Sequence, residues 1–264
     1  MSNTFIAVEG PHDVEFVAGI SESLGFSKVS QLDQLDPQFA RRLVKTTYPH
    51  NGDLYQRMPN PMFLQNGEHW LAIQSAGGET PKLLETLHDM FEGLKPLPGV
   101  LTSVGIIRDA DDLDGANQFK ALHAELQARL PFDGYEVRLP AEPGLISDSS
   151  PRLGVFVFPD NAQSGALEQL LLECGERVYP NLIAGAKTYV ASVDMAQLNA
   201  KDKSLFKKPH GREKATVACA ADILKPGMAI ATSIDQNRWL CEETLKLPRI
   251  DAIKKFLQEL CGLN

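Results

Sequence analysis

Four short apolar runs, each followed by a helical pattern, constrain the fold of this chain more than any other feature. The runs cover residues 5–8, 70–75, 104–107 and 155–158. After the first run, Val17, Ile20 and Leu24 recur at intervals of three and four residues, which is typical of one helix face. Strands that alternate with helices favour a mainly parallel sheet flanked by helices. We therefore expect an α/β fold.

The alternation is interrupted in two regions of the chain. Residues 30–68 contain four prolines and two turn signals, Asn51-Gly52 and Asn66-Gly67, and we expect an insertion or a long hairpin there. Beyond Gly175 the alternation fades into a region that we expect to be mainly helical. The sequence thus predicts a core over residues 1–175, with the insertion at 30–68, and a mostly helical C-terminal extension over residues 176–264.

Composition and charge exclude several classes of protein. The 264 residues are 43% hydrophobic, and the longest stretch without a charged residue spans 12 residues (96–107), too few to cross a membrane. The segment MSNTFIAVEG has no basic leader and no long apolar region, so we expect a cytoplasmic protein without a membrane partner. Four cysteines, separated by 45, 22 and 20 residues, lack the paired spacing of zinc sites, and we expect reduced, buried thiols.

Carboxylates follow three of the four expected strands. Glu9 comes after the first strand, Asp109 and Asp111 after the third, and Asp160 after the fourth. In open parallel sheets the functional crevice lies outside the carboxyl ends of the strands. If strand geometry continues one residue beyond Asp109, the side chains of Asp109 and Asp111 point to the same face of the strand and converge.

Asp13 adds a further acid to this edge of the sheet. It lies four residues after Glu9, which places both on one side of a helix that begins near Pro11. Carboxylates that meet without counterions raise one another's pKa values and cost stability, so a hard cation is the natural ligand. Mg²⁺ or Mn²⁺ fits an all-oxygen site best.

These motifs resemble the Toprim fold of topoisomerases, bacterial primases, small ribosomal RNA maturases and OLD-family nucleases. The matching residues are the glutamate that closes the first strand, AVEG with Glu9, and the Asp-x-Asp that closes a later strand, IIRDAD with Asp109 and Asp111. Asp13 is similar to the extra acid of the OLD type. The resemblance implies a Toprim-like, Rossmann-like sheet.

Two later segments extend the resemblance to about residues 5–220. FPDNAQSGALEQLL and GREKATVACAA are similar to a bacterial uncharacterised family with a Toprim-like core. By that resemblance Glu168 would match a further metal-binding acid, and Lys214 the basic residue near the scissile phosphate.

The activity that the resemblance implies is hydrolysis of phosphodiester bonds in DNA or RNA with two Mg²⁺ or Mn²⁺ ions, as part of a bacterial defence system. The implied metal ligands are Glu9, Asp13, Asp109, Asp111 and Glu168, and Lys214 would offset charge on the phosphate. Residues 201–214 contain six basic and two acidic residues in a protein of net charge −8, and would bind the nucleic-acid backbone.

OLD nucleases carry an ATPase module. This sequence has no Gly-x-x-x-x-Gly-Lys-Ser/Thr loop, so an ATPase or defence-system partner would be a separate chain.

Several alternative interpretations stay open for these residues. Considered without the strand before it, the turn at 109–115 is typical of a solvated loop. Glu168 is typical of an acid at the start of a helix, and Lys214 is typical of a solvated lysine. An EF-hand loop is excluded, because counting from Asp109 places glycine at the seventh position and Lys120 at the twelfth.

Two alternative functions also stay open. A haloacid-dehalogenase-like phosphatase would use Asp109 as nucleophile and Asp111 as acid, although that family usually places the motif on its first strand. The alternative from another class is a non-catalytic Toprim-like module that binds metal and nucleic acid or a protein. Assembly into a homo-oligomer is compatible with either function.

Overall fold

A mainly parallel sheet forms the centre of the fold. The computed structural model describes residues 2–48, 54, 60–78, 80–132 and 134–263. Within these residues the sheet has six strands in the order β2-β3-β4-β1-β5-β6. Their bounds are β1 (Ser2–Val8), β2 (Ser27–Val29), β3 (Met62–Asn66), β4 (His69–Ser75), β5 (Ser103–Asp109) and β6 (Arg152–Phe158). Strands β4, β1, β5 and β6 are parallel, whereas β3 and β2 add antiparallel pairs at one edge, so the expected α/β fold is confirmed.

Both faces of the sheet are buried, which explains why the strands are continuous apolar runs. In β1, Phe5 and Ala7 belong to the hydrophobic core on one face, and Ile6 and Val8 to the core on the other. All four side chains are fully buried. Strands covered on both faces have no solvent side that would require alternating polar residues.

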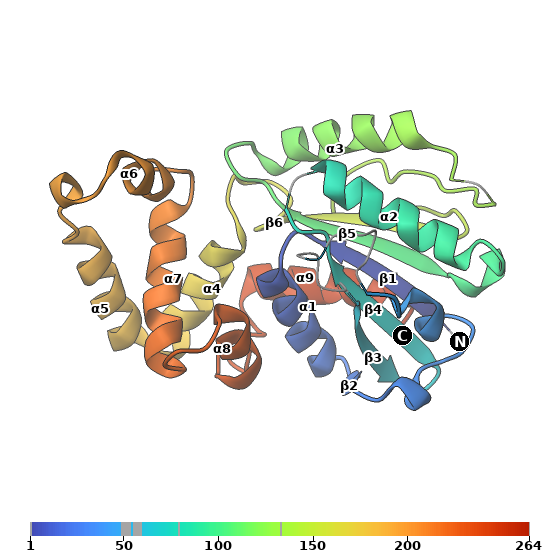
Figure 1. Cartoon of the computed structure of the whole chain (residues 1–264), viewed down its shortest axis with the longest axis horizontal. Helices are drawn as coiled ribbons and strands as arrows, with labels where there is room; N and C mark the ends of the chain where they lie inside the picture. The colour runs from blue at the N-terminus through green and yellow to red at the C-terminus, as the bar shows by residue number, and fades with distance from the viewer. Residues whose placement is uncertain (1, 49–53, 55–59, 79, 133, 264) are drawn as a thin grey trace.

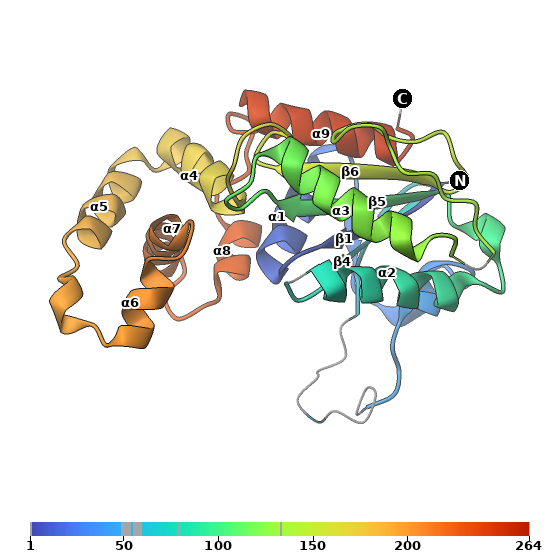
Figure 2. The same ribbon diagram turned by 90° about the horizontal axis from the view of Figure 1, so that it is seen from above.

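Helices cover the two faces of the sheet. Helices α2 (Thr80–Leu94) and α3 (Gly115–Arg129) contribute to one core, and α1 (Pro11–Ser23) and α9 (Pro248–Leu260) to the other. Figure 2 shows α2 and α9 on opposite sides of the strands. Helix α1 begins at Pro11 as predicted, and the chain leaves it through Gly25, which has a φ of 91°.

The segment at 30–68 combines short helical turns with part of a hairpin. It contains the 3-10 turns η1 (Leu32–Gln34) and η2 (Ala40–Leu43) and then β3, which pairs with β4 through a turn at Gly67 and Glu68, one residue after the predicted turn signal begins. Gly67 has a φ of 56°, a conformation that glycine adopts without steric cost. The turn predicted at Asn51-Gly52 lies outside the described residues.

The predicted helical region beyond residue 175 is helical, and part of it extends away from the sheet. It comprises the end of α4 (Leu167–Val178), then α5 (Pro180–Ala191), the 3-10 turn η5 (Met195–Gln197), α6 (Ala200–Phe206), α7 (Gly211–Leu224), α8 (Ile230–Gln236) and α9. A further 3-10 turn, η4 (Pro98–Val100), lies between α2 and β5. Figure 1 shows α5, α6 and α7 as an arm beside the core, whereas α8 packs against α1 and α9 returns to the sheet. None of the described helices combines the length and apolar character of a membrane span.

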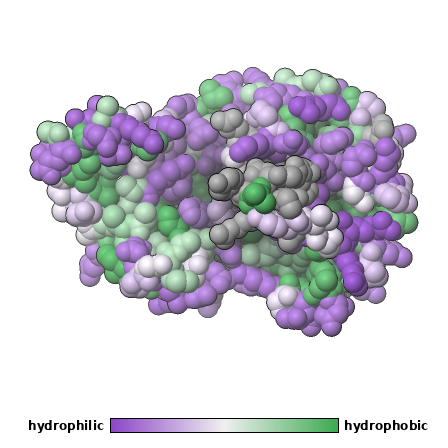
Figure 3. All heavy atoms as spheres, viewed as in Figure 1, coloured by the Kyte–Doolittle hydropathy of each residue, from purple (hydrophilic) through white to green (hydrophobic). Residues whose placement is uncertain are grey.

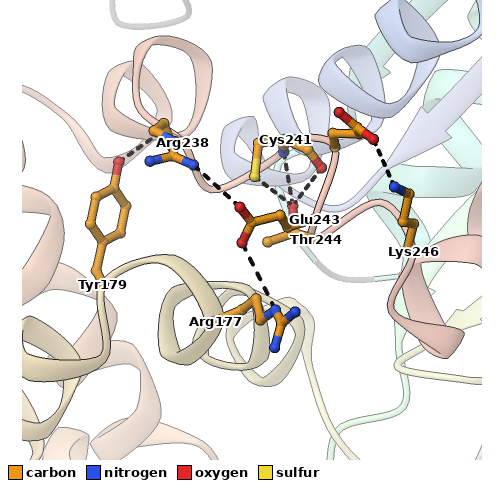
Figure 4. Close-up of polar contacts among 8 residues, drawn as sticks. Arg177, Tyr179, Arg238, Cys241, Glu243, Thr244 and Lys246 are labelled. Carbon is orange, nitrogen blue, oxygen red and sulfur yellow. Dashed lines mark hydrogen bonds and ion pairs between the residues drawn. The ribbon is translucent and has the colours of Figure 1, made fainter.

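The loop between α8 and α9 fastens the arm to the core. Trp239 is fully buried and its indole N–H donates to Ser233 Oγ at 3.0 Å. Nearby, the Tyr179 hydroxyl accepts from the backbone N–H of Arg238 at 2.8 Å. Figure 4 shows this bond and the Glu243 carboxylate between two arginine side chains. The Tyr179 and Trp239 rings also pack with their centroids 6.1 Å apart, so the junction between α4 and α5 is joined to the loop that leads into α9 by both apolar and polar contacts.

The four cysteines are free thiols. Cys174 and Cys261 are buried, in agreement with the sequence prediction, whereas Cys219 and Cys241 are half-buried. The expectation of buried thiols is therefore correct for two of the four.

Candidate functional site

Four acids meet at the carboxyl edge of the parallel strands. Glu9 directly follows β1 and Asp109 ends β5, and these strands are neighbours with Val8 opposite Ile107. Asp13 and Glu168 lie in the first turns of α1 and α4, which start at the same edge. The charges of Glu9 and Glu168 raise the pKa values of both Asp13 and Asp109. We call Glu9, Asp13, Asp109 and Glu168 the acid cluster.

Asp109 is held at the start of α4. Its side chain is 8% exposed, and Oδ1 accepts a hydrogen bond from the Leu167 N–H at 2.9 Å. Burial raises the pKa of Asp109 well above its ordinary 3.8, and the charges of Asp13, Glu9 and Glu168 raise it further. The single backbone hydrogen bond opposes this effect without cancelling it.

Asp13 closes the first turn of α1 and is also buried. Its Oδ2 accepts from the Gly10 N–H at 2.6 Å, which satisfies a backbone donor at the helix start. Burial raises the pKa of Asp13 from 3.8 to about 7, with further contributions from Glu9 and Glu168. The proximity to Glu9 that the sequence spacing predicted is present.

Two oxygens of the acid cluster lack hydrogen-bond partners among the described residues. They are Glu9 Oε1 and Glu168 Oε2, both buried. Glu168 is 8% exposed although it lies in the first turn of a helix, where acids are usually solvated. Glu9 Oε1 lies 3.2 Å from Arg108 Nε in an ion pair that lacks hydrogen-bond alignment. An unpartnered buried carboxylate oxygen is costly unless a cation or a donor reaches it.

Arg108 has a role that the sequence reasoning missed. Its charge lowers the pKa of Glu9, but burial is the larger effect and the pKa stays raised. Arg108 Nη1 donates to Thr80 Oγ1 at 2.7 Å, and Gln118, with its amide oxygen facing the guanidinium, accepts from Nη2 at 2.6 Å. The sequence feature that could have indicated this role is the single basic residue in an otherwise apolar strand, directly before Asp109.

Asp111 departs from the predicted geometry. Strand β5 ends at Asp109, and Asp111 has a φ of 52°, so strand geometry does not continue as the prediction required. The backbone of Asp111 instead pairs with Gly165, with N···O distances of 2.8 and 3.1 Å. Asp111 is exposed whereas Asp109 is buried, but its charge raises the pKa of Glu9, so the carboxylate lies close to the acid cluster.

Helix α7 brings a histidine and a lysine to the same edge. His210, at the start of α7, places Nε2 3.3 Å from the carbonyl oxygen of Asp111. Lys214 lies one turn later, is exposed, and lowers the pKa values of Glu9 and His12 through its positive charge. Burial is the main cause of the lowered pKa of His12. The sequence analysis singled out Lys214 but not His210, whose contact depends on the left-handed turn before α7, with a φ of 57°.

Asp160, after β6, has a structural role. Its Oδ1 accepts from the N–H groups of Ala162 and Gln163 at 3.1 and 2.8 Å. Its Oδ2 lies 3.1 Å from Arg249 Nε in an ion pair. Asp160 therefore caps a turn and joins it to the start of α9.

The donor chemistry of the acid cluster fits a hard divalent cation. All its side-chain donors are carboxylate oxygens, and two of them are buried without hydrogen-bond partners in the described residues. Among those residues, however, no three His, Cys, Asp or Glu side chains already lie in a metal-holding arrangement. A bound cation would therefore require these carboxylates to move closer together.

Comparison with known proteins identifies a family. The model of a family described as "Protein of unknown function (DUF3226)" matches residues 3–262. The chain belongs to the DUF3226 family. The crystal structure of a hypothetical protein from Pyrococcus horikoshii OT3 is similar, with a TM-score of 0.54 and 19% sequence identity. The match covers 98% of the chain described here and 95% of the Pyrococcus horikoshii chain. This likeness concerns the fold. No curated protein matches the chain.

Proposed function

We propose that this protein is a divalent-metal-dependent nuclease that hydrolyses phosphodiester bonds in DNA or RNA. The observation that carries the proposal is the acid cluster, in which carboxylates from the ends of two strands and the starts of two helices lie close enough for their charges to raise the pKa values of the buried Asp13 and Asp109. Such a group is unfavourable without a counterion, and a cation relieves the repulsion. The order of Glu9, Asp13, Asp109 and Asp111 along the chain resembles that of Toprim nucleases of the OLD type.

The residues of the site divide into metal ligands and groups that act on the phosphate. Glu9, Asp13, Asp109, Asp111 and Glu168 would hold Mg²⁺ or Mn²⁺. When bound, these ions supply an activated water and charge stabilisation of the leaving oxygen. Lys214, whose positive charge lowers the pKa of Glu9, would offset negative charge on the scissile phosphate. Arg108 would hold the Glu9 carboxylate at the end of β1 through their ion pair.

Binding of the nucleic-acid backbone would involve the tip of the arm. Six basic and two acidic residues lie at 201–214, which spans α6 and the start of α7. Because Lys214 belongs to this segment and acts on Glu9, a strand bound there would lie beside the acid cluster. Affinity for phosphates should fall as salt rises. A separate ATPase or another protein of a bacterial defence system would be the protein partner.

A non-catalytic role is the second candidate, and two observations favour it. Arg108 pairs with Glu9, and a paired carboxylate is less available to a metal ion. The described residues also lack a preassembled group of three metal-binding side chains. In this second function the same surface would bind a cation and nucleic acid or a protein without hydrolysis.

Metal-dependent cleavage distinguishes the two functions. Supercoiled plasmid and RNA would be incubated with Mg²⁺ or Mn²⁺ and wild-type protein, Asp109→Asn or Asp112→Asn. Asp112 is exposed in the same acidic turn and serves as the matched control. A nuclease predicts cutting by wild type and Asp112→Asn, and loss of cutting in Asp109→Asn and in chelator. Equal cutting by Asp109→Asn would contradict the proposal, and metal binding without cutting would favour the non-catalytic role.

A further inference from the structure

A pocket with an apolar floor and a cationic rim lies between α6 and the start of α7. Its volume is about 470 Å³. Leu198, Leu205, Phe206 and Pro209 line its apolar part, and the two positive charges of Lys208 and Lys214 exceed the one negative charge of Asp202. Leu205 is 51% exposed, so its side chain is accessible to a ligand. Figure 3 shows mainly hydrophilic residues over this end of the arm, in contrast to the apolar side chains that line the pocket.

Phe206 provides an aromatic surface beside the pocket. The guanidinium carbon of Arg212 lies 5.3 Å from the centroid of the Phe206 ring, a cation–π arrangement. Aromatic rings and guanidinium planes are the two kinds of side chain on which unpaired bases stack in proteins that bind single strands. Both occur here together.

Lys214 connects this pocket with the acid cluster. It lines the pocket, and its charge also lowers the pKa values of Glu9 and His12. Between them, His210 contacts the backbone of Asp111. A ligand in the pocket therefore lies beside the site where the proposed cleavage takes place.

We infer that the pocket binds one unpaired nucleobase and that the substrate is a single strand or an unpaired end. This inference rests on the proposed nuclease function. The apolar floor and Phe206 suit the face of a base, and the surrounding cations suit the adjacent phosphates. A base within a duplex has both faces stacked on its neighbours and does not present them to the pocket. The pocket therefore selects for strand type and places the neighbouring phosphate near Lys214.

Binding of the full chain to short fluorescein-labelled strands tests the inference. Fluorescence anisotropy in chelator and at fixed salt measures affinity without cleavage. We expect DNA or RNA single strands to bind about tenfold tighter than the duplex of the same length, as expected for stacking of one base. Replacing one nucleotide at a time by an abasic residue should weaken binding about tenfold at one position.

Substitutions then assign the effect to the pocket. Phe206→Ala should lose about tenfold in affinity and become insensitive to the abasic position, whereas Phe206→Trp should retain both. Ile223→Ala, at an exposed apolar residue near the other end of α7, is the matched control and should bind as wild type. Thermal unfolding of each variant checks folding. If Phe206→Ala fails to fold, the abasic scan on wild type decides alone.

The outcomes separate this inference from the proposed function. Equal affinity for single strand and duplex, or the absence of any sensitive abasic position, would overturn the base pocket even if Mg²⁺-dependent cutting is observed. Asp109→Asn, which removes a charge of the acid cluster, should keep the abasic sensitivity. Cutting that persists in Asp109→Asn would overturn the nuclease and leave the binding result intact.

Discussion

Replacing Asp13 by asparagine removes one buried charge from the acid cluster and keeps the start of α1 intact. An asparagine side-chain oxygen can accept the Gly10 N–H as Asp13 Oδ2 does at 2.6 Å. An asparagine is uncharged, so it removes the repulsion between Asp13 and the charges of Glu9 and Glu168 that raise the Asp13 pKa. The change therefore removes charge repulsion at a buried position and keeps the hydrogen bond at the helix start.

The size of the effect follows from the pKa of Asp13. Burial and the neighbouring acids raise it from 3.8 to about 7. At about 1.4 kcal/mol for each tenfold change in proton affinity, this corresponds to roughly 4 kcal/mol of folding free energy lost at pH 8. Asp13→Asn should recover much of that free energy without a metal ion.

The pH dependence has a defined sign. Because the folded protein keeps the Asp13 proton that the unfolded chain releases, wild-type stability falls as pH rises from about 4 to about 7. The free energy of unfolding would be measured by urea titration across this range in chelator. The difference between Asp13→Asn and wild type should be small near pH 4 and largest above pH 7. Asp33→Asn, on the exposed turn η1, is the control and should leave the profile unchanged.

A measurement with added metal ion completes this test. Saturating Mg²⁺ at pH 8 should raise the melting temperature of wild type more than that of Asp13→Asn, because a cation that binds the folded state stabilises it. A stability difference that is flat from pH 4 to pH 8, or an Asp13→Asn variant that is less stable at pH 8, would refute the reasoning about the acid cluster.

Two further predictions concern packing and thiol reactivity. Gly115→Ala would place a Cβ 2.3 Å from backbone atoms of Asn161 and should lower the free energy of unfolding in urea by about 1–3 kcal/mol. Gly185→Ala, in open space within α5, should raise that free energy by about 0.5–1 kcal/mol. Equal effects would contradict this packing. Burial opposes ionisation of Cys241, but N–H groups of the following turn hold its pKa below 9.0, while burial raises the pKa of Cys174 to about 12. Iodoacetamide should label Cys241 first by mass spectrometry, and faster labelling of Cys174 would disprove this.

The parallel strands could be predicted because they are covered on both faces. Each of β1, β4, β5 and β6 is an apolar run that ends at a polar or turn residue, a pattern that depends on local sequence. Strands β2 and β3 were not predicted, because they are short and their pairing joins Ser27 to Gln65, far apart in the sequence. The position of α9 on the sheet is also absent from the sequence signal, since an amphipathic pattern does not identify the surface that a helix covers.

The candidate site was predictable where it depends on strand ends and not where it depends on turns. Glu9 and Asp109 lie together because parallel strands end at one edge of a sheet. The position of Asp111 depends on a φ of 52° and on pairing with Gly165, which residue spacing does not encode. Arg108 pairs with Glu9 across neighbouring strands, a contact that becomes visible once the strand order is known.

Anomalous diffraction from crystals soaked in Mn²⁺ tests the central claim most directly. The account predicts manganese peaks bounded by carboxylate oxygens of Glu9, Asp109 and at least one other member of the acid cluster, and their loss in Asp109→Asn crystals. Wild-type crystals with manganese only elsewhere on the surface, and with Glu9 still paired to Arg108, would contradict it.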